Sequence, residues 1–178
     1  MKPDPERLRA VFNRLEPYIE DRWGIPVRIQ DVPNPFTGDL DGAEIMVDYD
    51  LDIEDAVFIL IHLFGHTVQW NASAKSRDIA FLQPAAWTDE QLRAAMAYEH
   101  EACGYSLQLL HDAGIHDLDQ WISDFAACDS AYLEHFYRTG EKRAFRSFWR
   151  DGTPLVTPQA IPKFQPTQWL SRRQGTVV

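Results

Sequence analysis

The chain has 178 residues, of which 45% are hydrophobic, so it is long and apolar enough to form one compact domain with its own core. The net charge of −10 argues against nucleic acid or an anionic membrane surface as the main partner. No apolar run approaches the roughly 20 residues that a membrane-spanning helix requires.

The charge is unevenly distributed along the chain. Residues 1–140 hold 10 basic and 25 acidic side chains, a net charge of −15, whereas residues 141–178 hold 7 and 2, a net charge of +5. We interpret this as a basic C-terminal arm folded over an acidic body, with a free basic tail that binds an acidic partner as the alternative. The N-terminus lacks the apolar core of a secretory signal, and two cysteines are too few for a disulfide framework. The sequence therefore predicts a cytoplasmic protein.

The N-terminal third predicts one helix and two strands. Apolar residues recur at helical spacing over residues 4–22, and Gly24 and Pro26 end that helix. Alternating patterns predict strands at 25–32 and 43–49, which we expect to pair. The intervening stretch, PNPFTGDLDG, has the composition of a turn-rich loop.

The middle of the chain predicts further helices. A helix that begins near Asp52 is apolar nearly all round, which is typical of a central buried helix, and a polar loop with the sequence NASAKSRD follows it. The TDEQ capping-box pattern at Thr88 opens the next helix, which Gly114 ends. Asp117 opens a helix that runs to Gly140, and a short basic aromatic helix follows at 141–150.

The C-terminal stretch predicts an extended arm. Prolines recur every four residues at positions 154, 158, 162 and 166, which excludes a helix. We therefore divide the chain into a domain at 1–151 and an arm at 152–178 packed on it. The arm is first of all a strap over apolar surface. As an alternative, the strand at 43–49 offers a free edge to which an extended segment, the arm included, can add.

Two histidines four residues apart, His62 and His66, lie in the apolar stretch VFILIHLFGHTVQW. Side chains at i and i+4 project from one helical face, so both imidazoles can converge on one metal ion. The alternative is a pair of core histidines that are satisfied by hydrogen bonds. Burial favours the metal, because an apolar helix offers few other partners to two imidazoles.

The stretch AAMAYEHEACGYSLQLL offers two candidates for a third ligand, Glu99 and Glu101. Glu99 lies at helical spacing within an apolar stripe, and an ionised carboxylate there requires a compensating cation. Glu101 shares its face with residues that are easier to solvate. The stripe around Glu99 consists of Leu92, Ala95, Met96, Cys103 and Leu110.

Together these motifs resemble the metal-binding helices of gluzincin-type metallopeptidases, and most closely the ImmA/IrrE-type group. The resemblance covers about residues 25 to 112, and it implies a zincin-like α+β fold, mainly helical with a small N-terminal sheet. It also implies one divalent metal, zinc in the first place, with iron or manganese as alternatives. The positions that match the family pattern are His62, Gly65, His66, Glu99 and Ala102.

Two positions depart from that family pattern. Leu63 stands where the family has the glutamate that takes a proton from the metal-bound water, and a leucine can neither accept nor donate a proton. Cys103 stands where the family often has an aspartate or asparagine that orients a ligand histidine, which a thiol does poorly. We therefore expect that ordinary peptide hydrolysis is lost.

Three functional hypotheses remain open. The first is a metal site with chemistry other than ordinary peptide hydrolysis, in which the metal activates a small molecule or another base activates water. The candidates for that base are His100, Glu101, Glu134 and His135. The second is a metal-binding pseudoenzyme that holds an extended peptide or protein segment without cutting it. The third is a metal-free interaction module in which an arginine, Arg93 or Arg138, pairs with Glu99.

Overall fold

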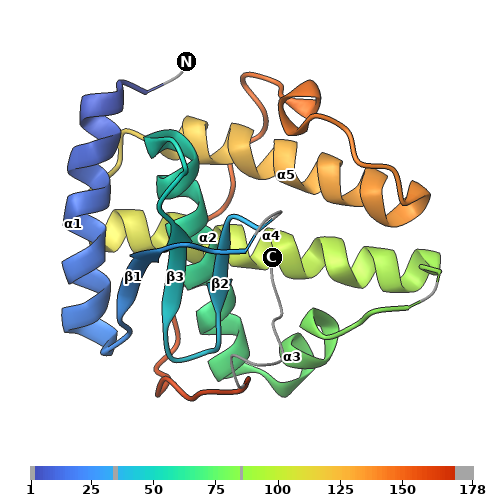
Figure 1. Ribbon diagram of the computed structural model, residues 1–178, viewed down its shortest axis with the longest axis horizontal. Coiled ribbons are helices and arrows are strands. Elements are labelled where there is room, and N and C mark those ends of the chain that lie inside the picture. The colour runs from blue at the N-terminus through green and yellow to red at the C-terminus, as the bar shows by residue number, and fades with distance from the viewer. Residues whose placement is uncertain (1–2, 34–35, 85, 171–178) are drawn as a thin grey trace.

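The computed structural model describes residues 3–33, 36–84 and 86–170 and shows a mainly helical chain with one small sheet (Figure 1). This arrangement confirms the predicted α+β class. No helix in these ranges is both long and apolar enough to cross a bilayer. The elements are α1 (Pro5–Trp23), β1 (Val27–Gln30), β2 (Gly38–Leu40), β3 (Ile45–Asp48), α2 (Ile53–Ala72), α3 (Ala74–Ala80), α4 (Asp89–Asp112), α5 (Asp119–Thr139) and the 3₁₀ turn η1 (Phe145–Phe148).

The sheet has the strand order β1-β3-β2, with β1 parallel and β2 antiparallel to β3. The two predicted strands are present as β1 and β3, and they pair as expected. The prediction that the strand at 43–49 offers a free edge is wrong, because β3 lies between two partners. The free edge beside it belongs to β2, a three-residue strand in the stretch predicted as a loop, which is too short to show an alternating pattern.

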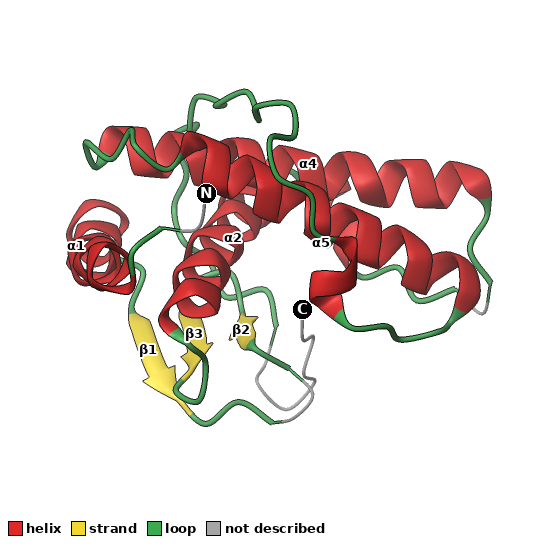
Figure 2. Cartoon of the chain, turned by 90° about the horizontal axis from the view of Figure 1, so that it is seen from above, coloured by secondary structure: helices red, strands yellow, loops and turns green. Residues whose placement is uncertain are grey.

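Helix α2 lies between the sheet and the helix pair α4 and α5, so it is the middle layer of the molecule (Figure 2). Asp52 caps its N-terminus by accepting hydrogen bonds from the backbone amides of Glu54 and Asp55. Nearly every residue from Val57 to Trp70 is buried, which agrees with the predicted central helix. Helix α1 covers the outer side of α2 next to β1.

The structure differs from the predictions at three short segments. Residues 74–80 form α3 rather than a loop, because Ser73 caps them by accepting from the amide of Ser76. The predicted helix at 141–150 is only the turn η1, since a short isolated helix is marginal and Arg146 instead binds acidic residues of α2. Asp117 does not cap α5, because it forms an ion pair with Arg7.

Residues 151–170 form neither helix nor strand, and they cross α5, α4 and α2 in turn. Their backbone amides donate to side chains or carbonyls of each element: Thr153 to Asp124, Val156 to Ser123, Gln159 to Gly104, Thr167 to Asn71, and Trp169 to Asp41. The last contact lies directly after the edge strand β2. The end of the predicted arm, residues 171–178, lies outside the described residues.

Candidate metal centre

The two histidines project from the face of α2 that packs on α4, and this contact is unusually close at Gly65. A Cβ atom at position 65 would collide with the backbone carbonyl oxygen of Ala102 on α4. Glycine therefore lets the two helix backbones approach, and this approach brings Glu99 of α4 to the histidines. His62, His66 and Glu99 are 2%, 1% and 6% exposed, so the cluster is inside the protein.

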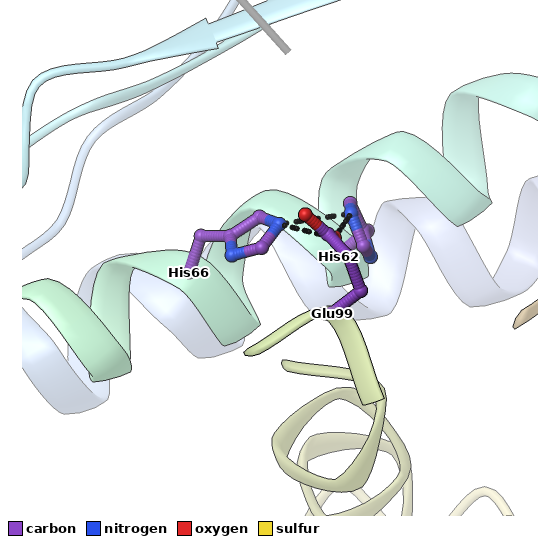
Figure 3. A group of neighbouring side chains, drawn as sticks. All are labelled: His62, His66 and Glu99. Atoms are coloured by element: carbon purple, nitrogen blue, oxygen red, sulfur yellow. Dashed lines mark hydrogen bonds and ion pairs between the residues drawn. The ribbon is translucent and has the colours of Figure 1, made fainter. Parts of the chain in front are cut away.

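His62, His66 and Glu99 converge on one point (Figure 3). The Oε2 atom of Glu99 lies 3.3 Å from Nε2 of His62 and 3.2 Å from Nε2 of His66. The two Nε2 atoms are 2.9 Å apart. Ligand atoms on a tetrahedral ion with bonds of about 2.0–2.1 Å are about 3.3 Å apart, so both nitrogen–oxygen distances fit such an ion and the nitrogen–nitrogen distance is shorter.

The Oε2 atom of Glu99 is buried and has no hydrogen-bond partner in the described part of the chain. Burial raises the pKa of this carboxyl, but His66 and His62 outweigh burial and hold the pKa below its ordinary value. The expectation that Arg138 pairs with Glu99 is wrong, because Arg138 binds Asp89 and Glu134. The alternative partner, Arg93, is exposed on α4.

Each imidazole is held at its second nitrogen. Nδ1 of His66 lies 2.9 Å from Oε1 of Gln69, and the amide nitrogen of Gln69 donates to the carbonyl of Tyr98 and to Glu101. This amide therefore orients its oxygen towards His66, which leaves Nε2 free to face Glu99. The signal in the sequence is a glutamine three residues after His66.

His62 has a weaker partner at its second nitrogen, the thiol of Cys103, whose Sγ lies 4.0 Å from Nδ1. Burial raises the pKa of this thiol, so it faces the imidazole as a neutral group. The ring of Phe58 stacks on His62 with 5.2 Å between ring centroids and fixes the imidazole from the side. The packing of Phe58 thus orients the His62 ring more than the distant thiol of Cys103 does.

A fourth titratable group, Asp129 on α5, faces the cluster and is absent from the candidates taken from the sequence. Its Oδ2 lies 4.0 Å from Nε2 of His62, and the side chain is 16% exposed. Burial raises the pKa of Asp129 to about 6, with His62 opposing this rise and Glu99 adding to it. The signal was present, because Phe125 and Tyr132 at i−4 and i+3 make the same kind of apolar stripe that distinguished Glu99.

The other proposed bases lie elsewhere. His100 is exposed, and Glu101 is occupied with Gln69. His135 faces away from the cluster, towards Glu141 and the ring of Phe148. Glu134 forms an i,i+4 ion pair with Arg138. None of these four belongs to the group of close ligand atoms found among the described residues.

Leu63 occupies a different environment from the histidines beside it. It is 1% exposed, and its Cδ1 atom lies 2.7 Å from the point where a Cβ atom would stand on Gly38 of β2. The side chain therefore packs beneath the edge strand, in the layer between α2 and the sheet. This position belongs to the hydrophobic core, which accounts for a leucine there.

A small cavity of about 100 Å³ reaches the cluster from the side of α3, α4 and α5. His66 and Glu99 lie at one part of its wall, and the remaining wall is mostly aromatic or aliphatic. No residue of the segment 151–170 lines it. The other lining residues are Trp70, Ile79, Ala80, Leu82, Trp87, Ala95, Tyr98 and Tyr137.

Comparison of the chain with protein-family models, with curated proteins and with solved structures returned no match.

Proposed function

We propose that this protein binds one divalent metal ion through His62, His66 and Glu99, at a centre of gluzincin-like descent that has lost ordinary peptide hydrolysis. The observation that carries the proposal is the buried Oε2 of Glu99, which has no hydrogen-bond partner among the described residues and lies within 3.3 Å of two imidazole nitrogens. A cation at that point satisfies the carboxylate and both imidazoles together. Zinc is the first candidate, with iron or manganese as alternatives.

The loss of peptide hydrolysis rests on two features of the site. Leu63 packs under β2 and offers no group that can exchange a proton. The ligand atoms are nearly inaccessible, and the neighbouring cavity of about 100 Å³ is too small for an extended peptide. A bound divalent ion would supply Lewis acidity there, and Gln69 and Phe58 would hold the imidazoles in place.

A second candidate function is metal-dependent chemistry on a small molecule. The observation that favours it is the cavity wall, where aromatic side chains surround the approach to His66 and Glu99. Such a lining accepts a compact, partly apolar ligand of a few heavy atoms. The site is therefore compatible either with a metal-binding pseudoenzyme or with an enzyme that acts on a small substrate.

The proposal is tested by the metal content of protein purified without added metal. We expect about one equivalent of metal in the wild type, close to none in His62→Ala, and a strong loss in Glu99→Gln. His100→Ala is the matched control, because it removes an exposed histidine one residue from Glu99, and it should keep the full equivalent. A metal-free wild type, or a His62→Ala variant that keeps its metal, would refute the proposal.

A further inference from the structure

We infer that Asp129 of α5 is a fourth protein ligand of the same ion, so that helices α2, α4 and α5 together close the metal centre. This inference rests on the proposed metal site and adds a ligand that the two-helix motif does not contain. The Oδ2 atom of Asp129 lies 4.0 Å from Nε2 of His62, which is the ring nitrogen that faces Glu99.

Charge is the first reason. The cluster brings two carboxylates, Glu99 and Asp129, to one pair of imidazoles inside the protein. In the described part of the chain, His62 is the only ion-pair partner of Asp129, and the basic residues of α5 and η1 bind elsewhere. Two carboxylates together carry the charge that one divalent cation neutralises.

Geometry is the second reason. Ligand atoms on a four-coordinate ion are about 3.3 Å apart, but with bonds of about 2.1 Å the separation in five- and six-coordinate ions reaches roughly 4.2 Å for opposite ligands. The 4.0 Å between Asp129 and His62 falls in this wider range, while 3.2 and 3.3 Å for Glu99 fit adjacent ligands. Asp129 lies outside the group of ligand atoms that are all within 4.8 Å of one another, so its carboxylate must turn towards an ion held by His62, His66 and Glu99 in order to bind it.

The position of α5 is fixed well enough to deliver this carboxylate. The ring of Phe125, one turn before Asp129, stacks on Phe58 of α2 with 3.9 Å between ring centroids, and Phe58 in turn stacks on His62. Trp121, a further turn back, donates a hydrogen bond to the buried Glu54 of α2. These contacts lock the face of α5 that carries Asp129 against the metal-binding face of α2.

The test is metal binding by the Asp129→Asn variant, which keeps the shape of the side chain and removes its charge. We expect the Zn²⁺ affinity, measured by competition with a chromophoric chelator, to fall by about tenfold or more. In the Co²⁺-loaded protein we also expect the visible absorption bands to change in position and intensity, because the coordination of the ion changes. Glu134→Gln is the matched control, since it neutralises an exposed carboxylate on the same helix, and it should leave affinity and spectrum unchanged.

The outcomes separate this inference from the proposed function. If the wild type binds no metal, both fail. If the wild type binds Zn²⁺ and Asp129→Asn keeps the wild-type affinity, or loses affinity while its Co²⁺ spectrum is unchanged, Asp129 is not a ligand and the three-residue centre stands. Asp129→Asn should fold, because it removes a largely buried charge whose one ion-pair partner among the described residues is His62. The far-ultraviolet circular dichroism of the metal-free variant checks this.

Discussion

Gly65 is the residue of α2 that lies directly against the backbone of α4. A methyl group at this position meets the backbone carbonyl of Ala102, which cannot move without shifting α4. We expect Gly65→Ala to lower the free energy of unfolding by about 2 kcal/mol, even though alanine is the better helix former, and to weaken metal binding. Urea denaturation of the metal-free protein measures the first effect, and chelator competition measures the second.

Gly104 provides the control for this prediction. It lies on α4 where the segment 151–170 crosses that helix, and a Cβ atom there meets first the side chain of Gln159, at 2.8 Å from Cγ, which can rotate away, and then the carbonyl oxygen of Thr157 at 3.2 Å. Gly104→Ala should therefore cost clearly less than Gly65→Ala and leave metal affinity unchanged. Equal costs for the two variants would show that the α2–α4 contact adapts to a side chain at position 65.

Leu63 is the residue at which descent from a peptidase is most directly tested. Leu63→Glu restores the missing glutamate of the sequence motif but places a carboxylate in the core beneath β2. We expect a loss of about 3 kcal/mol or more in the free energy of unfolding, and no peptidase activity on an unstructured protein substrate. Leu63→Met, which conserves volume, should be nearly neutral. Metal-dependent cleavage by Leu63→Glu would contradict this account of the site.

At the scale of elements, Asp124 joins α5 to the C-terminal segment. Its Oδ1 atom accepts from the amide and hydroxyl of Thr153 and from Gln120, and the side chain is 1% exposed. We expect Asp124→Ala to lower the free energy of unfolding by about 2 kcal/mol, because the partly buried amide and hydroxyl of Thr153 lose their acceptor. Asp124→Asn should cost less, since the amide oxygen can accept the same bonds.

The same residue gives a pH dependence with a defined sign. Burial raises the pKa of Asp124, but its hydrogen bonds with Thr153 and Gln120 outweigh burial and lower the pKa below its ordinary value. The charged form is therefore favoured by folding, so its contribution is present above about pH 4 and is lost as pH falls through the lowered pKa. The difference in stability between wild type and Asp124→Ala should shrink in urea titrations below pH 4, and a difference that grows there would contradict the assignment.

The sequence predicted the long elements and missed the short ones. Helices α1, α4 and α5 have periodic apolar faces, α2 is apolar nearly all round, and end signals such as Thr88 and Gly140 are local. Strand β2 has only three residues and forms by pairing with β3, so no local sequence pattern predicts it. The turn η1 is likewise set by tertiary contacts of Arg146 rather than by helix propensity.

The candidate site was predicted where its residues lie on one helix or in one stripe, and was missed where it depends on how helices pack. His62 and His66 follow from i,i+4 spacing, and Glu99 from its apolar neighbours. The apolar stripe on α5 marks Asp129 as a buried carboxylate, but its approach to His62 depends on how α5 packs against α2, which the sequence of α5 does not show. His135, chosen from the same helix, is six residues further on and therefore projects from a different face.

At the scale of the whole molecule, the proposed metal centre joins the middle layer of the fold to the outer one, because His62 and His66 belong to α2 and Glu99 to α4. An ion bound there stabilises the folded state by about 4 kcal/mol when free metal exceeds the dissociation constant a thousandfold. For a domain of this size, that corresponds to a rise of about 10 °C in Tm. For the wild type and for His100→Ala, we expect differential scanning calorimetry to record this difference between the Zn²⁺-loaded and the chelator-treated protein. For His62→Ala, we expect the two Tm values to be the same. The metal-free proteins should keep most of their stability, since the core extends over α1, the sheet and α5 and does not depend on the cluster. A Tm that is the same with and without metal in the wild type would mean that the buried carboxylate of Glu99 is compensated by protons rather than by a cation.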